Sequence, residues 1–291
     1  MSQSSLLDAI TAQRGIITCE QFQQLALQLD ADDNATAKWL LAHFKSWAFP
    51  PISKFYVSAL VRAENEHGED FFALGVNVEL PHCALDTAVH AEQTAIHNAW
   101  LNGAVALKHI YINAAPCGYC RQFMNEFVVN QRLAVSINDT HTDLEQLLPL
   151  AFGPEDLNIS QRVLTTSEQL SAQSNSNDQR SALMSHLAHS YAPYSGGRAA
   201  VQIDYEGKAY FGRYIENAAF NPSFNPFLAA LSQIALTGKG IDFDKISAVT
   251  LAEEPSLKSH QSAVQSIVKV VAAHAQFDYL SSSSARAASI T

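Results

Sequence analysis

Apolar residues in the first 48 positions recur every three or four residues, which is the spacing of an amphipathic helix. Leu6 and Ile10 belong to the first such run, and Gly15 would end it. Two further runs follow, EQFQQLALQLD and ATAKWLLAHFKSWAF, and the second ends before a pair of prolines that cannot continue a helix. The pattern predicts a helical N-terminal segment over residues 1–48.

Short runs of β-forming residues then alternate with helical runs. FYVSALVRA and FFALGVNVE indicate two strands joined by the polar turn ENEHGED, which predicts a hairpin. The next helix would run from an N-cap at Thr87 to a C-cap at Gly103, and another would begin at Pro116. With the strands KHIYINA and LAVSIND, this alternation predicts an α/β layer structure over residues 49–160.

A polar stretch rich in Ser, Asn and Gln, residues 161–180, is typical of a linker. Over residues 181–291 the alternation of helices, hairpin and strands begins again. GVNVE at 75–79 and GRYIE at 212–216 each close a hairpin. We infer that the second half is a diverged copy of the first, although two generic hairpins could also look alike by chance.

Charge and composition narrow the class of partner. The chain carries 18 Lys and Arg against 28 Asp and Glu, a formal net charge of −10, and its basic residues form no cluster. Nucleic-acid-binding proteins normally present a basic face, so the sequence argues against such a partner. We also expect a cytoplasmic protein with no membrane partner, because no uncharged apolar stretch of about 18 residues is present and the N-terminus lacks the features of a signal peptide.

Two of the four cysteines, Cys117 and Cys120, stand three apart at a predicted helix start. Without a secretory signal, paired cysteines indicate metal or redox chemistry and not a disulfide. This spacing lets both sulfurs face one cation, and free N–H groups at a helix start stabilise thiolates. Together with His90, at the start of the preceding helix, they form a set that suits tetrahedral zinc and leaves one position open for water.

Glu92 lies two residues after His90. Two thiolates cancel the charge of zinc and weaken it as a Lewis acid, so a nearby carboxylate is needed to take the proton from water. Glu92 is therefore the candidate proton shuttle. Counted from the glutamates that close the two hairpins, Phe227 takes the place of His90 and Ala229 that of Glu92, so we expect one zinc per chain and none in the second half.

Two other kinds of protein remain open at this point. A structural zinc module would need a closed set of four ligands, which His82 or Cys83 could complete, and it would leave Glu92 without a task. A thiol redox protein would use the cysteine pair and need neither His90 nor Glu92.

The order H-x-E followed by P-C-x-x-C is the pattern of zinc deaminases. HAEQTAI with the preceding NVE, PCGYCRQFMNEF, LPLAFGPEDL at 148–157 and ENAAFNP at 216–222 resemble the bacterial cytidine deaminases of the long, two-copy type. The resemblance begins near residue 36 and covers nearly all that follows, least closely in the polar linker. It implies a three-layer α/β/α fold with a mixed sheet, present in two copies, and a homodimer whose second domain carries no zinc.

The resemblance also implies the reaction. It is the hydrolytic deamination of the free nucleosides cytidine and 2′-deoxycytidine to uridine and 2′-deoxyuridine, a step of pyrimidine salvage. His90, Cys117 and Cys120 would hold the zinc that activates the attacking water, and Glu92 would carry its proton to N3 of the base.

Substrate contacts follow from the same resemblance. Phe55 would lie against the pyrimidine ring, Asn77 and Glu79 would hold the ribose 3′-hydroxyl, and Ala91 would contact the nucleoside. Because Asn77 and Glu79 are two apart on a predicted strand, both side chains face the same side. A deaminase of nucleotides or nucleic acid would instead need Lys or Arg near the sugar, where this chain has Glu79.

Two aromatic residues would close the pocket, again by resemblance. One is Phe152, and the other is Phe220 of the partner subunit, which makes the second domain part of the neighbouring active site. The alternative for both, as for Phe55, is an ordinary core aromatic.

Overall fold

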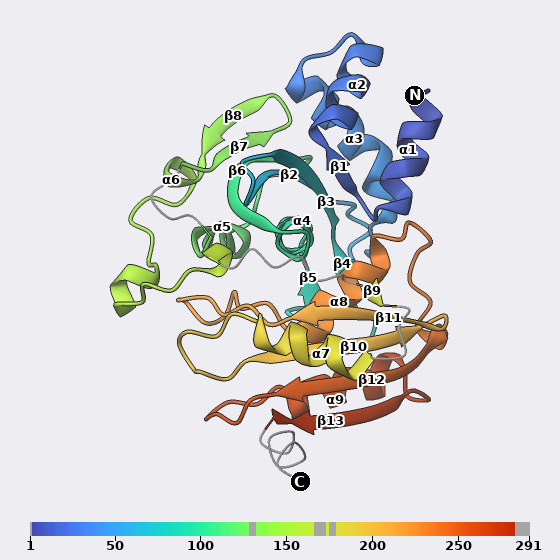
Figure 1. The fold of residues 1–291 in the computed structure, drawn as a ribbon, viewed down its shortest axis with the longest axis vertical. Helices are drawn as coiled ribbons and strands as arrows, with labels where there is room; N and C mark the ends of the chain where they lie inside the picture. The colour runs from blue at the N-terminus through green and yellow to red at the C-terminus, as the bar shows by residue number, and fades with distance from the viewer. Residues whose placement is uncertain (1, 128–131, 166–172, 175–178, 283–291) are drawn as a thin grey trace.

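The structure, a computed structural model, describes residues 2–127, 132–165, 173–174 and 179–282. The N-terminal half forms one sheet and the C-terminal half a second (Figure 1). Two helices, α4 (Ala91–Leu101) and α8 (Pro226–Ala235), contact each other between the two sheets. One helix from each half therefore lies at the contact between the halves.

Three helices precede the prolines, as the spacing predicted: α1 (Gln3–Ala12), α2 (Cys19–Leu29) and α3 (Asp33–Phe44), followed by the short 3₁₀ turn η1 (Lys45–Trp47). The segment is not purely helical, which corrects the prediction for residues 1–48. Strand β1 (Ile16–Thr18) pairs antiparallel with β3 (Asp70–Val76). Three residues are too few to show the period of a strand, so this pairing was missed.

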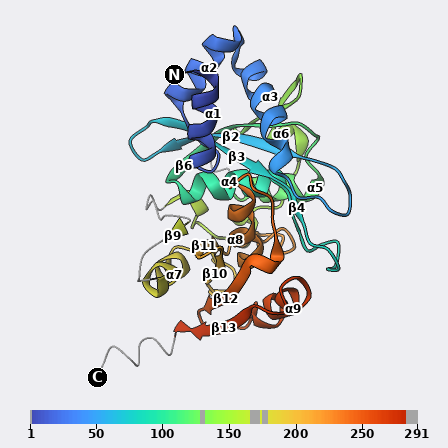
Figure 2. The same cartoon turned by 90° about the vertical axis from the view of Figure 1, so that its right-hand side faces the viewer.

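The first sheet has the order β1-β3-β2-β6-β7-β8 and is mixed, because β6 and β7 are parallel whereas the other neighbours are antiparallel. The remaining strands are β2 (Ser58–Asn65), β6 (Ala104–Ile112), β7 (Ala134–Ile137) and β8 (Thr140–Asp143). Helix α3 packs on one face and α4 on the other (Figure 2). This is the expected three-layer α/β/α arrangement.

Shorter elements complete the first half. Strands β4 (Val78–Glu79) and β5 (Ala88–Val89) pair with each other beside α4. The rest are α5 (Gly118–Asn125), α6 (Leu144–Leu147), η2 (Pro154–Leu157) and η3 (Val163–Thr165).

The second sheet has the order β9-β11-β10-β12-β13, which repeats the first five positions of the first sheet. Its strands are β9 (Gln173–Ser174), β10 (Ala199–Tyr205), β11 (Lys208–Arg213), β12 (Ile246–Glu253) and β13 (Gln276–Ser281). Its helices are α7 (Gln179–Ala188), α8 and α9 (Gln261–Val271), with the 3₁₀ turn η4 (Phe243–Lys245). The inferred second copy is confirmed.

The predicted linker, residues 161–180, is only partly described. Residues 166–172 and 175–178 lie outside the described residues. Between them β9 pairs with β11, as β1 pairs with β3 in the first half. A piece of the stretch that composition assigned to a linker thus belongs to a sheet.

One glycine in each half brings a helix close to its sheet. A Cβ on Gly75 of β3 would stand 2.1 Å from the nitrogen of Ala95 and 2.3 Å from the oxygen of Ala91. Gly212 of β11 meets α8 in the same way, at 2.1 Å from Ala230 N and 2.3 Å from Pro226 O. No side chain fits at either position, so each glycine is required for the contact of α4 or α8 with its sheet.

These matching contacts correct the alignment made by counting residues. Ala91 and Pro226 are equivalent, so the N-cap His90 corresponds to the N-cap Asn225, and Glu92 corresponds to Phe227. Counting had instead placed Phe227 opposite His90. It failed because the connection into α8 is two residues shorter than the connection into α4.

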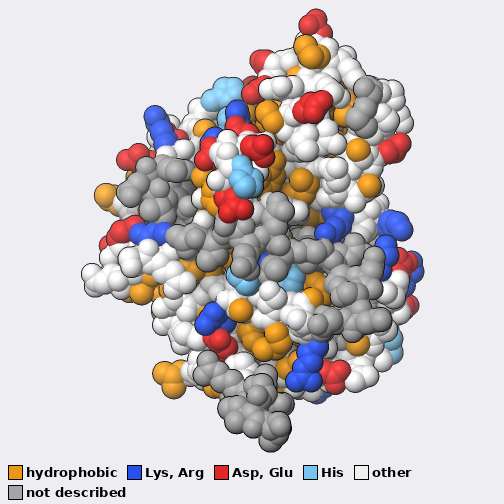
Figure 3. All heavy atoms as spheres, in the orientation of Figure 1, with side chains coloured by type: hydrophobic (Ala, Val, Ile, Leu, Met, Phe, Trp, Pro, Cys, Tyr) orange, Lys and Arg blue, Asp and Glu red, His pale blue; other side chains and the backbone are white. Residues whose placement is uncertain are grey.

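The basic residues, which form no cluster along the sequence, are also dispersed on the visible face of the structure. On the face seen in Figure 3, Lys and Arg side chains are scattered among acidic and apolar ones. Within the described part of the chain, no helix combines the length and the apolar character needed to cross a bilayer.

Candidate active site

His90 is the N-cap of α4, with an extended backbone. Its N–H donates to Gln93 Oε1 at 3.1 Å, so Gln93 satisfies the backbone at the helix start and the His90 ring makes no capping bond. Thr87 is not the cap. Strand β5 intervenes between Thr87 and the helix, which begins at Ala91.

Cys117 is the N-cap of α5, and Cys120 lies in the first turn of that helix, as the spacing predicted. Cys117 is exposed and Cys120 is fully buried. Arg121 holds the turn before them, because its Nε donates to Pro116 O and its Nη1 to Leu147 O, both at 2.9 Å. The helix start is therefore tied to two neighbouring segments.

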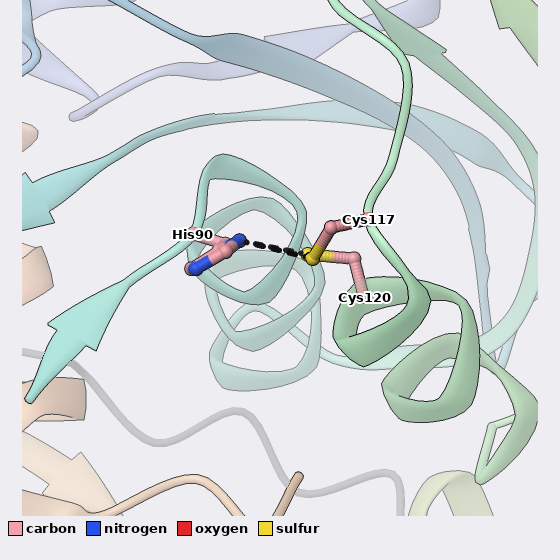
Figure 4. A group of neighbouring side chains, drawn as sticks. All are labelled: His90, Cys117 and Cys120. Carbon is pink, nitrogen blue, oxygen red and sulfur yellow. Dashed lines mark hydrogen bonds between the residues drawn. The ribbon is translucent and has the colours of Figure 1, made fainter. Parts of the chain in front are cut away.

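The three side chains converge in the geometry of a metal site (Figure 4). His90 Nδ1 lies 3.5 Å from Cys117 Sγ and 3.2 Å from Cys120 Sγ, and the two sulfurs are 3.7 Å apart. Bond lengths of about 2.3 Å for Zn–S and 2.0–2.1 Å for Zn–N in a tetrahedron imply edges of about 3.8 Å and 3.5 Å. The donor set and its spacing fit zinc.

Among the described residues, these three form the only group of His, Cys, Asp or Glu with ligand atoms so close together. Neither His82 nor Cys83 joins it, so the four-ligand set of a structural zinc module is not formed by the described side chains. Cys83 is half-buried and packs against the core, and burial raises the pKa of its thiol. Three ligands leave a position for water, as in catalytic zinc sites.

The pKa values of two ionisable groups at this centre are shifted in opposite directions. Hydrogen bonding to Cys120 and to His90 lowers the pKa of the Cys117 thiol, which favours the thiolate that binds zinc. Glu92, in the first turn of α4, is only 3% exposed, and burial raises the pKa of its carboxyl group.

A cavity of about 270 Å³ opens beside the cluster. Its lining includes most of the residues proposed for the site from sequence: Phe55, Asn77, Glu79, His90, Ala91, Glu92 and Cys117. Ala91 is fully buried, whereas Phe55 is 60% exposed at the mouth. The cavity therefore places a buried carboxylate, the metal-binding cluster and an aromatic ring around one space.

Glu79 is bound by residues just beyond the prolines. Its Oε2 accepts from the N–H groups of Ile52 and Ser53 at 2.9 Å each, and the Ser53 hydroxyl donates to Oε1. Burial alone would raise the pKa of Glu79, but these hydrogen bonds outweigh it and lower the pKa. Glu79 therefore faces the cavity as a carboxylate.

Asn77, two residues before Glu79, binds the backbone of the segment that follows Ser53. Its Nδ2 donates to Phe55 O at 2.9 Å, and its Oδ1 accepts from Val57 N at 2.8 Å. Both ends of the amide thus bond the backbone that carries the Phe55 ring. Asn77 lines the cavity as expected and also positions Phe55.

Of the predicted residues, Cys120 lies behind the lining as part of the His–Cys–Cys group, and the aromatic residues Phe152 and Phe220 do not line the cavity within one chain. Phe152 and Phe220 are 45% and 66% exposed. The Gln122 side chain, on α5, donates to Phe152 O at 2.8 Å and to Asn217 Oδ1 at 3.4 Å, so both aromatic segments are attached to this helix. Phe220 has a left-handed backbone, with φ of 61°, which is uncommon for a residue other than glycine.

The corresponding place in the second half cannot hold this metal centre. Asn225 and Phe227 replace His90 and Glu92, and at the start of α9 the N-cap is His260, with Ala263 three residues later. Lys258 fills the space, with Nζ 3.9 Å from the centre of the Tyr214 ring and 2.9 Å from His260 Nε2. Neither Cys117 nor Cys120 therefore has a cysteine as its counterpart in the second half.

A larger cavity, of about 460 Å³, lies elsewhere, beside Trp100, Arg162 and Arg198. Arg162 is paired with Glu155, and Arg198 Nε lies 2.9 Å from Glu254 Oε2. No metal-binding group of described residues borders it. Its size alone does not make it a catalytic site.

Sequence comparison reaches both halves of the chain. Residues 33–136 and residues 144–266 each match a family described as "Cytidine and deoxycytidylate deaminase zinc-binding region". The second match covers the half that lacks the cysteine pair. The matches begin before the boundaries at residues 49 and 181 that the sequence pattern suggested, so those boundaries stay predictions.

Two relatives, both cytidine deaminases, agree with the family match. The chain is 39% identical over 241 residues to a cytidine deaminase of Shewanella sediminis, covering 82% of this chain and 79% of that protein. It is 42% identical over 237 residues to a cytidine deaminase of Shewanella sp. strain MR-7, covering 79% and 78%. A crystal structure of cytidine deaminase from Mycobacterium leprae aligns with a TM-score of 0.33 at 24% identity, over 40% of this chain and 96% of that one.

Proposed function

This chain belongs to the zinc-dependent cytidine and deoxycytidylate deaminase family, and we propose that it converts cytidine and 2′-deoxycytidine to uridine and 2′-deoxyuridine with release of ammonia. One observation carries the proposal: a single cavity of about 270 Å³ borders the His–Cys–Cys cluster, the buried Glu92 and the Glu79 carboxylate. A place in pyrimidine salvage is part of the proposal, because the product nucleosides keep their sugar.

His90, Cys117 and Cys120 are the ligands in this proposal. Zinc held there would lower the pKa of a water molecule and so would supply a nucleophile for C4 of the base near neutral pH. Glu92 takes the proton from that water and delivers it to N3 of the pyrimidine. The same carboxylate would then carry the proton of the new C4 hydroxyl to the amino group, so that C4=O forms as the C4–N bond breaks and ammonia leaves.

The other cavity residues bind and orient the nucleoside. Phe55 at the mouth packs against the base, and Asn77 and Glu79 bind the sugar hydroxyl. A carboxylate at the sugar accepts a hydroxyl proton but repels a phosphate in the same place. This charge favours a free nucleoside over nucleic acid.

The substrate is tested directly with purified protein. We expect the absorbance change of deamination and release of ammonia with cytidine and with 2′-deoxycytidine. A short deoxycytidine oligonucleotide with a 3′-terminal phosphate, in which every 3′-oxygen is esterified, should react at least about 100-fold more slowly, because juxtaposed like charges cost several kcal/mol. Equal rates on the nucleoside and the oligonucleotide would contradict the proposal.

Measuring the zinc content shows whether the chain has one zinc site or two. We expect about one zinc per chain by elemental analysis, because the second half has Asn225, His260 and Ala263 in place of the three ligands. Chelation should abolish turnover and added zinc should restore it. Two zinc ions per chain would show that a second site exists.

A homodimer is the proposed assembly. Phe152 and Phe220 are exposed on segments that bond to α5; Phe152 would close the cavity of its own chain, whereas the partner's Phe220 would complete each active site. The left-handed backbone of Phe220 supports this role, since strained positions concentrate where a residue has a binding task.

A further inference from the structure

Ser53 is the one cavity-lining residue whose hydroxyl joins the sugar acceptor to the aromatic ring. Its Oγ accepts from the N–H of Phe55 at 3.0 Å and donates its proton to Glu79 Oε1. A serine hydroxyl has a single proton. Oγ thus accepts from Phe55 through one of its two lone pairs and uses its only proton in the bond to Glu79.

The same arrangement occurs in the second half. The Ser195 hydroxyl donates to Glu216 Oε1, and the N–H groups of Tyr194 and Ser195 donate to Glu216 Oε2 at 2.8 Å and 3.1 Å. Ser195 Oγ accepts from Gly197 N at 3.1 Å. Every bond made by Ser53 and Glu79 therefore has a counterpart.

The backbone of the turn is also repeated. The residue after the serine is left-handed in both halves, with φ of 57° at Lys54 and 66° at Gly196. Lysine adopts this conformation at a cost. The bonds from Ser53 and Glu79 to the turn help to hold it.

The two copies differ in what lies beyond the carboxylate. In the first half it is the open cavity. In the second half the space is filled, because a Cβ on Gly197, the counterpart of Phe55, would stand 2.2 Å from Ser256 Oγ and 3.1 Å from Lys258 Cε. In the second half, the serine–glutamate pair therefore holds the same turn, but the space beside it is too small for a nucleoside.

We propose that Ser53 is a positioning residue for the sugar, which fixes the Glu79 carboxylate so that its unused lone pairs face the 3′-hydroxyl of a nucleoside. This inference rests on the proposed function, in which Glu79 binds the ribose. Oε2 is already held by two backbone N–H groups. The Ser53 hydroxyl holds the second oxygen and thereby sets the rotation of the carboxylate.

The test compares Ser53→Ala with Ser195→Ala in the full-length chain. Steady-state kinetics are measured with cytidine and with 3′-deoxycytidine, and thermal unfolding is followed for each protein. Ser53→Ala should raise the KM for cytidine about tenfold, since hydrogen bonds to charged groups are among the stronger ones, and change kcat less than about threefold. Its KM for 3′-deoxycytidine, which lacks the hydroxyl, should change much less.

Ser195→Ala is the matched control, because it removes the same hydrogen bond where the space is filled. It should lower the unfolding temperature about as much as Ser53→Ala and leave both KM values unchanged. Tyr194 keeps a second anchor in this variant, its hydroxyl bond to Glu126 at 2.5 Å. Ser53→Thr, which retains a hydroxyl, should keep the KM of the wild type for cytidine.

Three results would overturn the role of Ser53: an unchanged KM for cytidine in Ser53→Ala, an equal rise for both nucleosides, or an equal rise in Ser195→Ala. If Ser53→Ala does not fold, Ser53→Cys, with a weak donor of similar size, should raise the KM for cytidine selectively, and a wild-type KM would again overturn it. Failure of the proposed function itself is distinguishable, because the wild-type protein would then not deaminate cytidine.

Discussion

Replacing Glu92 with Ala is expected to lower kcat for cytidine by at least about 10⁴-fold while the chain stays folded and keeps its zinc. General acid–base catalysis by one group is typically worth about 10² to 10⁴, and here one carboxylate serves the attack, the protonation of N3 and the departure of ammonia. Glu92 lies outside the group of His90, Cys117 and Cys120 whose ligand atoms cluster. Its removal should therefore not empty the metal site.

Single-turnover kinetics, zinc analysis and circular dichroism on the same preparation test this expectation. The KM for cytidine should change far less than kcat, because the lost interaction is made chiefly in the transition state. Glu92→Gln, which keeps the size of the side chain, should be nearly as inactive as Glu92→Ala.

Glu126→Gln is a matched control for loss of a buried carboxylate. Glu126 is fully buried and accepts from the Tyr191 hydroxyl at 2.9 Å and from Ala218 N at 2.9 Å, but it does not line the cavity. This variant should be less stable, with kcat within about threefold of the wild type.

Two outcomes would contradict the role of Glu92. Loss of zinc from Glu92→Ala would mean that the carboxylate is a ligand or supports one. A zinc-loaded variant with near-normal turnover would remove Glu92 from the mechanism. A thiol redox protein would keep its activity in this variant, since its chemistry needs only the cysteine pair.

The isolated segment 49–160 is expected to be inactive and unfolded. It lacks β1, which pairs with β3, and α3, which packs on β2 and β6. It also lacks Phe224, whose ring centre lies 5.5 Å from that of His97 and 6.0 Å from that of Phe123. A fully buried large apolar side chain contributes about 1.5–3 kcal/mol, so loss of several removes much of the 5–15 kcal/mol by which a typical domain is stable.

Circular dichroism, size-exclusion chromatography and the cytidine assay measure this result. The full-length chain, prepared in parallel, is the control. A soluble, monomeric and fully active fragment would contradict the expectation and would remove the need for a second domain or subunit.

Mixing two full-length variants then tests whether low activity comes from a folding defect or from the loss of a residue that the partner subunit supplies. Phe220→Ala should impair turnover in the full-length protein, and Glu92→Ala should be inactive. After the two variants are mixed and allowed to exchange, activity should rise to about a quarter of wild type, because half of the dimers are mixed and each has one complete site. No rise on mixing would show that Phe220 does not act on a neighbouring site.

The zinc cluster could be predicted from sequence because its residues occupy local positions that short motifs encode. His90 and Cys117 are both helix N-caps, and Cys120 lies within the same first turn as Cys117. Helix starts depend on a few consecutive residues, so their spacing is visible in the chain. The repeated succession of hairpin, helices and strands along the chain was predictable for the same reason, since periodicity marks each element.

What the sequence could not determine depends on contacts between distant segments. Strand β1 exists because it pairs with β3, and Ser53 matters because the turn carrying it lies against Glu79, 26 residues away. A comparison of SKFYVSA with SGGRAAV could have drawn attention to this serine, but not to its bond.

The equivalence of the two halves, too, was settled only by packing. Counting along the chain placed Phe227 opposite His90, whereas the close contacts of Gly75 and Gly212 align His90 with Asn225. By itself the sequence predicted most of the elements, the His–Cys–Cys group and the duplication, because local patterns mark each of them. Only the tertiary structure decided which surfaces meet, because connections of different length can still bring equivalent helices onto equivalent strands.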